Sequence, residues 1–348
     1  MPTVYITEPG ATIRFSTGSI VVTVSEDPDG KGPLPRRSRQ LIEIEPHRIE
    51  MIALVGRIHI TSHATRFCID QGIPVAWFKR NGDFLGRLVP ELSRTADLRL
   101  AQYSTAVDPA KSLSFAIEFV FGKVHNALSV LSAIRSNRTG ISELGAAIGK
   151  LKDYMASVVK ADSVDSLLGY EGVAAKAYFG GLQFGFDGEI EFDGRQRRPP
   201  PDPANALLSF GYVILANLLS SVLEARDLDP YVGFMHGGRS GRPSLALDML
   251  EELRAPIVDR FVLRMCNRRQ LRLEHFKQDK ENGGIRLTRI GLRIFFREWE
   301  AFLDRPLPGI KSDEPIETII RNQVDRLAAH LRGHEKYSAV RLGMPYPA

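Results

Sequence analysis

Two different hydrophobic patterns divide the chain near residue 105. Before this point, short runs of Val, Ile, Thr and aromatic residues alternate with clusters of Gly, Pro, Asp and Ser, which is typical of strands separated by turns. After it, apolar residues recur at the three- and four-residue spacing of helices. We therefore expect an α+β protein, with a β-sandwich or β-roll domain over residues 1–104, a linker at 105–112 and an all-α domain over 113–348.

The first pattern predicts strands at 4–7, 12–15, 19–25, 40–46, 49–56 and 73–78. A short helix is expected to interrupt them, with Ser62 as its N-cap and Gly72 as its C-terminal stop. Asn81-Gly82 follows the last strand and is a strong signal for a hairpin turn.

The second pattern begins at Asp108-Pro109, a favourable helix start with Asp as N-cap and Pro at the first helical position. Apolar residues at helical spacing then predict a helix through 112–134 and further helices at 141–160, 163–180, 203–226, 244–270, 288–303 and 315–333. Three consecutive prolines, 199–201, forbid a helix and predict an extended, exposed segment within 191–203.

The composition narrows the class of protein. Cys68 and Cys266 are the only cysteines and lie in different halves, which excludes a disulfide framework and argues against a thiolate zinc site. The chain has no uninterrupted run of eighteen apolar residues and no secretory pattern at its start. We therefore expect a cytoplasmic protein that does not contact membranes.

The net charge of +5 is unevenly distributed. Residues 254–297 contain twelve Lys or Arg residues and four Asp or Glu residues. Such an excess is typical of a phosphate-binding surface, although a solvated helix face would have the same composition.

The segment 233–254 carries the most informative polar residues. A glycine-rich loop contains His236, and the helix that follows places Asp248 three residues before Glu251 and four before Glu252, on one face. Carboxylates at this spacing are usually solvated. Here, however, leucines and a methionine surround the helix, which predicts burial, and buried carboxylates need a partner. A divalent cation such as Mn²⁺ or Mg²⁺ would supply one, with His236 completing the ligands.

Two further segments carry candidate residues. Glu171 lies among glycines and alanines that would let another helix approach closely, although it could instead cap a helix or pair with Lys176. Arg195, Arg197 and Arg198 precede the three prolines, and these side chains suit phosphate binding as well as they suit a solvent loop. Nucleotide-binding and hydrolase motifs of the forms GxxxxGK[ST], GxSxG and HExxH are absent from the sequence.

Taken together, these segments resemble a known family. YEG at 170–172, RRPPPDPANALLSFGY at 197–212 and YVGFMHGGRSGRPSLALDMLEELR at 231–254 look like the signature segments of the first core CRISPR-associated adaptation protein, and IPVAWFKRNGDFLGRL at 73–88 looks like its N-terminal β-domain. That family is the endonuclease and integrase that inserts new spacers into CRISPR arrays. The resemblance covers roughly residues 3–335, and ENGGIRLT at 281–288 is most similar to the subtype I-C branch.

The resemblance implies an activity and its residues. The metal ligands fall on Glu171, His236 and Glu251, with Asp248 in a supporting catalytic position and Mn²⁺ or Mg²⁺ as the cofactor. The 3′-hydroxyl of a captured prespacer would attack a phosphodiester at the leader–repeat boundary without a covalent protein nucleophile. The helical domain would then be catalytic, and the β-domain would serve dimerisation and DNA contact.

The same resemblance implies partners. Homodimers would flank a dimer of the second CRISPR adaptation protein in a heterohexamer, with a nuclease-like adaptation protein as a further partner. Our candidates for DNA contacts are Arg195, Arg197, Arg198, Asn205, Arg239, Arg242, Arg254, Lys277 and Arg286. Two other functions remain compatible with the residues, a metal-dependent DNase of DNA repair and a non-catalytic DNA-binding scaffold.

Overall fold

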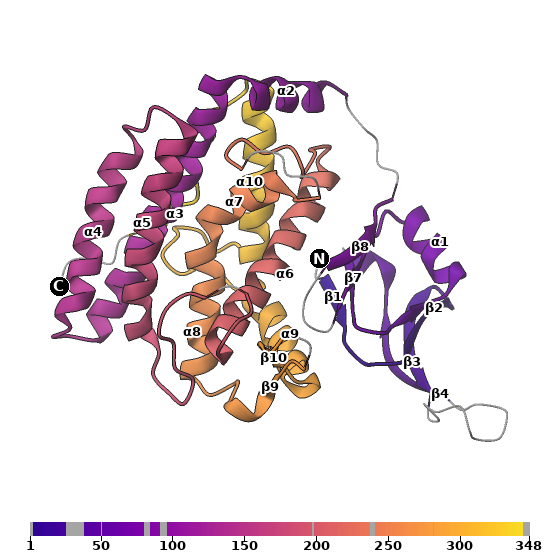
Figure 1. The fold of residues 1–348 in the computed structure, drawn as a ribbon. Coiled ribbons are helices and arrows are strands. Elements are labelled where there is room, and N and C mark those ends of the chain that lie inside the picture. Colours follow the sequence, from indigo (N-terminus) through magenta and orange to yellow (C-terminus); the bar gives the residue numbers. More distant parts are fainter. Residues whose placement is uncertain are drawn as a thin grey trace. The chain divides into compact units, whose positions relative to one another are not determined.

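The computed structural model describes residues 3–25, 38–49, 51–79, 84–90, 96–196, 198–236, 241–280 and 282–343. The chain divides into two compact units, Met1–Ser93 and Arg94–Ala348 (Figure 1). The first unit is mostly strand and the second mostly helix, so the expected α+β class is confirmed.

The first unit is a sandwich of two four-stranded sheets, with strand orders β1-β5-β7-β8 and β4-β3-β2-β6. Buried residues of both sheets, among them Ile13, Val22, Leu54 and Val75, share one core. The bounds of its elements are β1 Thr3–Ile6, β2 Ala11–Ser16, β3 Ser19–Ser25, β4 Ser38–Ile44, β5 Met51–Val55, β6 His59–Ile60, α1 Ser62–Asp70, β7 Val75–Phe78 and β8 Phe84–Leu88.

Two local predictions in this unit have specific outcomes. The short helix α1 is present, but its N-cap is Thr61 rather than Ser62, because the Thr61 hydroxyl accepts the N–H of Ala64. Gly72 follows the helix with a φ of 69°, as a glycine stop requires. Strands β7 and β8 pair antiparallel as a hairpin should, while the Asn81-Gly82 turn lies outside the described residues.

The second unit packs its helices around two long apolar ones, α3 and α6. Its elements are α2 Ala96–Val107, α3 Pro109–Asn137, α4 Ser142–Val158, α5 Val164–Leu182, α6 Pro203–Ala225, α7 Ser244–Leu253, α8 Arg260–Asn267, β9 Phe276–Gln278, β10 Ile285–Leu287, α9 Arg289–Leu303 and α10 Ile316–Leu331. Asp108 caps α3 by accepting the N–H groups of Ala110 and Lys111, as expected from the sequence.

The division between the units differs from the expected position. Residues 105–112, expected to be a linker, form the end of α2 and the start of α3, and the division falls after Ser93. The reason is that α2 packs on the helical unit, where the buried Gln102 amide donates to the carbonyls of Asp229 and Val232, both at 2.7 Å.

The helix expected over 244–270 is also interrupted. Helix α7 ends at Leu253, a π-helical segment follows over Arg254–Asp259, and α8 then begins. Pro256 lies within this segment and has no N–H to donate, which accounts for the change in hydrogen bonding. The small antiparallel pair β9–β10, within the basic cluster, was not expected either.

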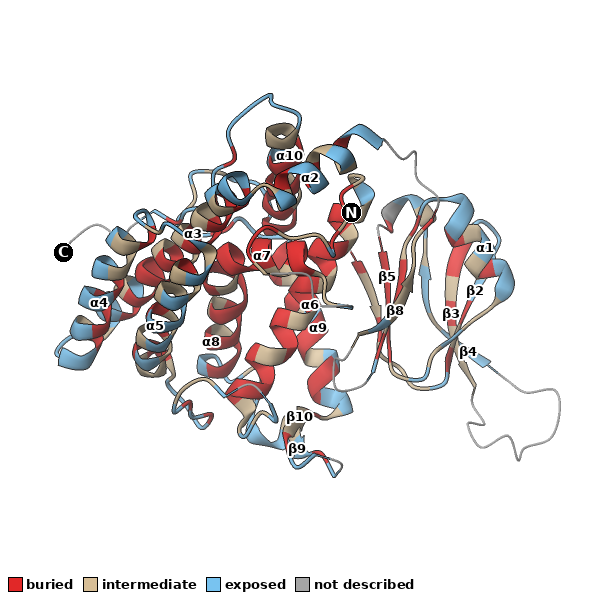
Figure 2. Ribbon diagram, turned by 45° about the horizontal axis from the view of Figure 1, so that its top comes forward, coloured by how far each residue is buried: buried red, intermediate tan, exposed pale blue. Residues whose placement is uncertain are grey.

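Helices α3 and α6 are long and apolar enough, by composition, to cross a membrane. Their apolar side chains instead pack inside the protein, and 89% of the most apolar stretch of α6 is buried. Figure 2 shows α6 and α8 as largely buried helices, while α4 exposes one side. This is the burial expected of core helices in a soluble protein.

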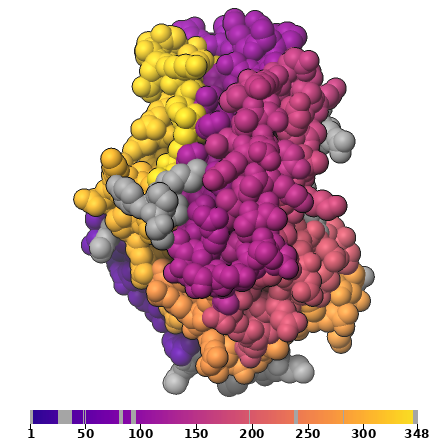
Figure 3. Space-filling model, turned by 90° about the vertical axis from the view of Figure 1, so that its left-hand side faces the viewer, coloured from indigo at the N-terminus to yellow at the C-terminus, as the bar shows by residue number. Residues whose placement is uncertain are grey.

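The residues after α10 return to the middle of the helical unit. His330 Nδ1 accepts the N–H of Tyr337 at 2.7 Å, and Ser129 donates to the carbonyl of Gly343 at 3.0 Å. Figure 3 shows this yellow C-terminal part running alongside the purple residues of α2 and α3. We call residues 337–343 the C-terminal segment.

Candidate metal-binding and catalytic site

Helix α7 presents three buried carboxylates in three different surroundings. Asp248 and Glu252 have no exposed surface and Glu251 is 4% exposed, which matches the burial predicted from the apolar residues around the helix. Each carboxylate has its own set of partners, and these partners separate their roles.

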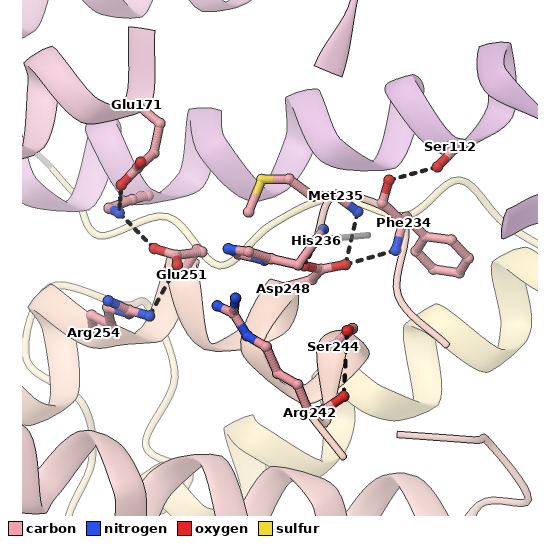
Figure 4. A network of polar contacts seen from close by, with 11 residues as sticks. Ser112, Glu171, Phe234, Met235, His236, Arg242, Ser244, Asp248, Glu251 and Arg254 are labelled. Carbon is pink, nitrogen blue, oxygen red and sulfur yellow. Dashed lines mark hydrogen bonds and ion pairs between the residues drawn. The ribbon is translucent and has the colours of Figure 1, made fainter. Parts of the chain in front are cut away.

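Asp248 binds the loop that carries His236. One carboxylate oxygen accepts the N–H groups of Phe234 at 2.7 Å and Met235 at 2.9 Å. The other lies 3.1 Å from the N–H of His236 and 2.6 Å from its Nδ1 (Figure 4). A histidine that donates from Nδ1 to a carboxylate is fixed in orientation and leaves Nε2 available as an acceptor. Asp248 therefore holds both the loop and the ring.

Gly233 allows the loop to come this close. A Cβ atom at this position would lie 2.6 Å from Oδ2 of Asp248 and 2.8 Å from the carbonyl carbon of Ser244. Both distances are too short for contact, so a larger residue would push the loop away from α7.

Glu171 and Glu251 meet at Lys123. The Lys123 ammonium, from α3, forms an ion pair with Glu171 of α5 and a second with Glu251 at 2.6 Å. Arg254 adds a third contact, at 3.0 Å from the other oxygen of Glu251. Lys123 and Glu171 lie 48 positions apart in sequence, and Figure 4 shows the side chains of Glu171 and Glu251 turned toward each other.

The surrounding charges keep Glu251 ionised. Burial alone raises the pKa of its carboxyl, but the positive charges of Arg254 and Lys123 outweigh burial and bring the pKa to about 2. His236 lies close enough to contribute in the same direction. Glu251 is therefore a buried anion at neutral pH, as a metal ligand must be.

Glu252 faces away from this cluster. It accepts the Tyr337 hydroxyl at 2.6 Å and the N–H of Val340 at 2.8 Å, so it binds the C-terminal segment. Burial raises the pKa of Glu252 to about 8, despite these donors. Its role is structural.

The donor set fits a hard divalent cation. Carboxylates are ligands that suit Mn²⁺ and Mg²⁺, an imidazole would add one nitrogen ligand, and both carboxylates already turn toward one positive charge. In the part of the chain that the structure describes, no three His, Cys, Asp or Glu side chains stand close enough together to hold an ion without adjustment. The ligand roles of Glu171, His236 and Glu251 therefore stay predictions.

A further buried carboxylate, that of Asp259, lies near Arg254. Asp259 accepts the hydroxyls of Tyr178 at 2.7 Å and Tyr212 at 2.5 Å. The guanidinium groups of Arg254 and Arg195 lie over the Tyr212 ring, 5.0 and 5.5 Å from its centroid. Cation–π contacts of this kind fix arginine side chains in place.

Several DNA-contact candidates have structural partners. Arg254, expected on a phosphate, lies against Glu251 and Tyr212 inside the site. Asn205 is fully buried, accepts from Arg195 and donates to the carbonyl of Gly194. Because this burial closes Asn205 to DNA, we replace its predicted contact with a role in holding Arg195.

Other candidates meet on one surface. Arg198 and Lys277 are exposed, and Arg286 pairs with Lys277 across the β9–β10 ladder. The N–H of Ile285 donates to the carbonyl of Pro200 at 2.8 Å, which ties this ladder to the segment of Arg198. Arg242 lies at the start of α7, half-buried. Arg197 and Arg239 lie outside the described residues.

Sequence reasoning missed Lys123 and Asp259. Lys123 interrupts a run of apolar residues from Phe119 to Val124, and a lysine within such a run is a signal of a paired, buried charge. Asp259 likewise follows apolar residues, directly before α8. Its two tyrosine partners come from other helices, so no local sequence pattern indicates these contacts.

Comparison with known proteins agrees with this architecture. The family described as CRISPR associated protein Cas1 matches residues 4–301. A relative named CRISPR-associated endonuclease Cas1 2, from Rhodospirillum rubrum, is 34% identical over 345 residues, which cover 95% of each chain.

Two solved structures share the fold. A Cas1 protein from Thermotoga maritima has a TM-score of 0.79 at 24% identity, covering 98% of this chain and 100% of that one. A casposase bound to an integration product also has a TM-score of 0.79, at 23% identity, covering 100% and 94%. With the family match spanning both units and a relative 34% identical along nearly the whole length, this chain belongs to the CRISPR associated protein Cas1 family.

Proposed function

We propose that this protein is a metal-dependent DNA endonuclease and integrase of CRISPR adaptation, acting in the cytoplasm. The observation that carries the proposal is the convergence of Glu171 and Glu251 on one positive charge, with His236 held nearby by Asp248. The name of the relative, an endonuclease, and the integration product bound to the casposase support the same reaction class.

Glu171, His236 and Glu251 would hold Mn²⁺ or Mg²⁺, which supplies a Lewis acid for a phosphoryl oxygen. The other residues prepare the site. Asp248 fixes the orientation of the His236 ring through Nδ1 and leaves Nε2 outside that contact, and Arg254 adds a fixed positive charge beside Glu251. Phosphoryl transfer depends on positioning and electrostatics, so the 3′-hydroxyl of a DNA end can attack the phosphodiester without a protein nucleophile: its oxygen bonds to phosphorus, its proton passes to solvent, and the 3′-oxygen of the target strand leaves.

The proposed substrates are a prespacer and the CRISPR leader–repeat DNA. Arg198 and Lys277 offer positive charge for their phosphates on a surface outside the metal site, whereas Arg286 is paired with Asp279 at 3.3 Å and would contact a phosphate only beside that carboxylate. We further propose a homodimer, a heterohexamer with the second CRISPR adaptation protein, and a nuclease-like adaptation partner, all on the resemblance to the family.

The test is integration of a labelled prespacer into a supercoiled plasmid that carries a CRISPR array. Glu171→Gln and His236→Ala should each lower strand transfer at least about 100-fold, because each removes one proposed ligand. DNA binding should persist in both, and Glu143→Gln, an exposed glutamate on α4, should act as wild type.

The outcomes separate the alternatives. Nicking of the plasmid without joining would replace the integrase by a metal-dependent DNase, such as one of DNA repair. DNA binding by wild type with neither nicking nor joining would leave a non-catalytic DNA-binding scaffold, and full strand transfer by both variants would show that Glu171 and His236 are not the catalytic residues.

A further inference from the structure

Within the described part of the chain, Lys123 is the one positively charged side chain that forms ion pairs with both proposed acidic ligands, Glu171 and Glu251. Its ammonium pairs with Glu171 and with Glu251, at 2.6 Å for the second, and only 12% of its side chain is exposed. It comes from α3, whereas the proposed ligands come from α5, α7 and the loop before α7. Lys123 is therefore a separate structural contribution to the site.

The charge of Lys123 has a direct effect on the two carboxylates. Without a positive group between them, the carboxylates of Glu171 and Glu251 would repel each other, and the buried Glu251 would lack compensation for its lost hydration. The ammonium offsets this repulsion in the protein without a metal ion. It keeps Glu171 and Glu251 turned toward each other at little cost.

The same contacts place Lys123 in competition with a divalent cation. Both need the same carboxylate oxygens, and two positive charges a few ångströms apart repel each other strongly where water is scarce. A lysine can withdraw because its ammonium is carried on a flexible four-carbon stem, which a guanidinium fork bound to two partners cannot do as readily.

We propose that Lys123 is a positioning residue that takes the place of the divalent cation in the metal-free protein and leaves when the cation binds. It preserves the arrangement of the two carboxylates and lowers the affinity of the site for metal. This inference rests on the proposed metal-dependent function. Lys123, which is not one of the proposed ligands, would then control how readily the site takes up the metal ion.

The experiment measures Mn²⁺ binding to the full-length protein without DNA, from the electron paramagnetic resonance signal of free Mn²⁺. Lys123→Met keeps the stem and removes the charge, so it should bind Mn²⁺ about tenfold more tightly or better. Lys111→Met, on the same helix with a side chain 64% exposed, should bind as wild type. Equal or weaker binding by Lys123→Met would overturn the proposal.

Thermal unfolding supplies a second readout. The metal-free Lys123→Met variant should unfold at a lower temperature than wild type, and saturating Mn²⁺ should raise its Tm by more than it raises that of wild type. A lysine with a structural role alone would lower the Tm equally with and without Mn²⁺. A variant that folds only with Mn²⁺ supports the proposal, and one that folds in neither condition contradicts it.

Glu171→Gln distinguishes the two possible failures. If wild type and every variant fail to bind Mn²⁺, the proposed metal site itself is wrong. If wild type binds Mn²⁺ and Glu171→Gln binds it more weakly, the site stands. In that case unchanged binding by Lys123→Met refutes the role of the lysine alone.

Discussion

Asp248 has no exposed surface, yet its carboxylate accepts three backbone N–H groups and faces His236. Asp248→Asn would turn an amide N–H₂ toward one of these donors. We expect the free energy of unfolding to fall by about 2 kcal/mol, as for a buried donor left without an acceptor, together with a loss of DNA strand transfer. Urea unfolding measures the first effect. Asp153→Asn, at an exposed position on α4, should change stability by less than about 0.5 kcal/mol.

Asp259 predicts a pH dependence of stability. Burial raises the pKa of its carboxyl to about 6, although the hydroxyls of Tyr212 and Tyr178 oppose this. The unfolded chain has a value near 3.9. Since the folded protein holds the proton more tightly, stability is greatest below about pH 4 for this group and falls as pH rises through about 6, by about 2–3 kcal/mol in all.

Urea unfolding of wild type and Asp259→Asn between pH 4 and 7 isolates this group. The stability of wild type relative to the variant should decline across that range. A difference that is constant, or that grows with pH, would contradict the raised pKa.

The candidate residues themselves were visible in the sequence to different degrees. The three- and four-residue spacing on α7 placed Asp248 and Glu251 on a buried face, because helix periodicity and apolar neighbours are local properties. The approach of Glu171 depended on a separate helix: its glycine and alanine neighbours indicated that a helix could come close, and the ligand role itself came from the resemblance to the family. Lys123 and the two tyrosines around Asp259 were missed, since contacts between distant helices leave no periodic signal.

Among the elements, the C-terminal segment is bound by several side chains, and one buried side chain of α3 makes three of the contacts. Asn126 is fully buried, donates to the carbonyls of Glu252 at 2.7 Å and Val340 at 2.8 Å, and accepts the N–H of Leu342. Asn126→Ala should lower the free energy of unfolding by about 3 kcal/mol, because three buried backbone groups lose their partner. It should also speed proteolytic cleavage within residues 337–343.

Asn137→Ala is the matched control, since Asn137 is exposed at the end of the same helix and donates within it. Its stability should stay within about 0.5 kcal/mol of wild type. Equal protease resistance of Asn126→Ala and wild type would show that other contacts suffice to hold the segment.

The elements were predicted well where their signals were local. Asp108-Pro109 gave the start of α3, and β-branched runs gave the strands of the sandwich. The strand orders, with parallel pairs between β1 and β5 and between β5 and β7, could not be read from alternation, because alternation defines faces rather than neighbours. The expected linker at 105–112 failed because polar residues of α2 are buried against the helical unit.

At the scale of the whole molecule, positive charge outside the metal site predicts how DNA binding responds to salt. If Arg198 and Lys277 each neutralise one phosphate, Arg198→Ala with Lys277→Ala should reduce the slope of log affinity against log salt by about 0.9 per contact. Fluorescence anisotropy of labelled duplex DNA across a salt series measures this slope. Lys152→Ala, at an exposed position on α4, is the control, and an unaltered slope in the double variant would remove this surface from the DNA path.

The π-helical segment Arg254–Asp259 has a consequence for alignment and engineering of the chain. A π turn accommodates one residue more than an α turn, so a relative whose helix continues without interruption needs a one-residue gap here. An alignment without this gap would shift α8 by one residue. Because each residue of an α-helix turns the chain by about 100°, Phe261, Met265 and their buried neighbours would be placed on the wrong face. Deleting one residue within 254–259 should therefore convert the π turn to an α turn and keep the buried face of α8 in register, whereas a one-residue deletion in the helix outside this segment would turn that face away from the core.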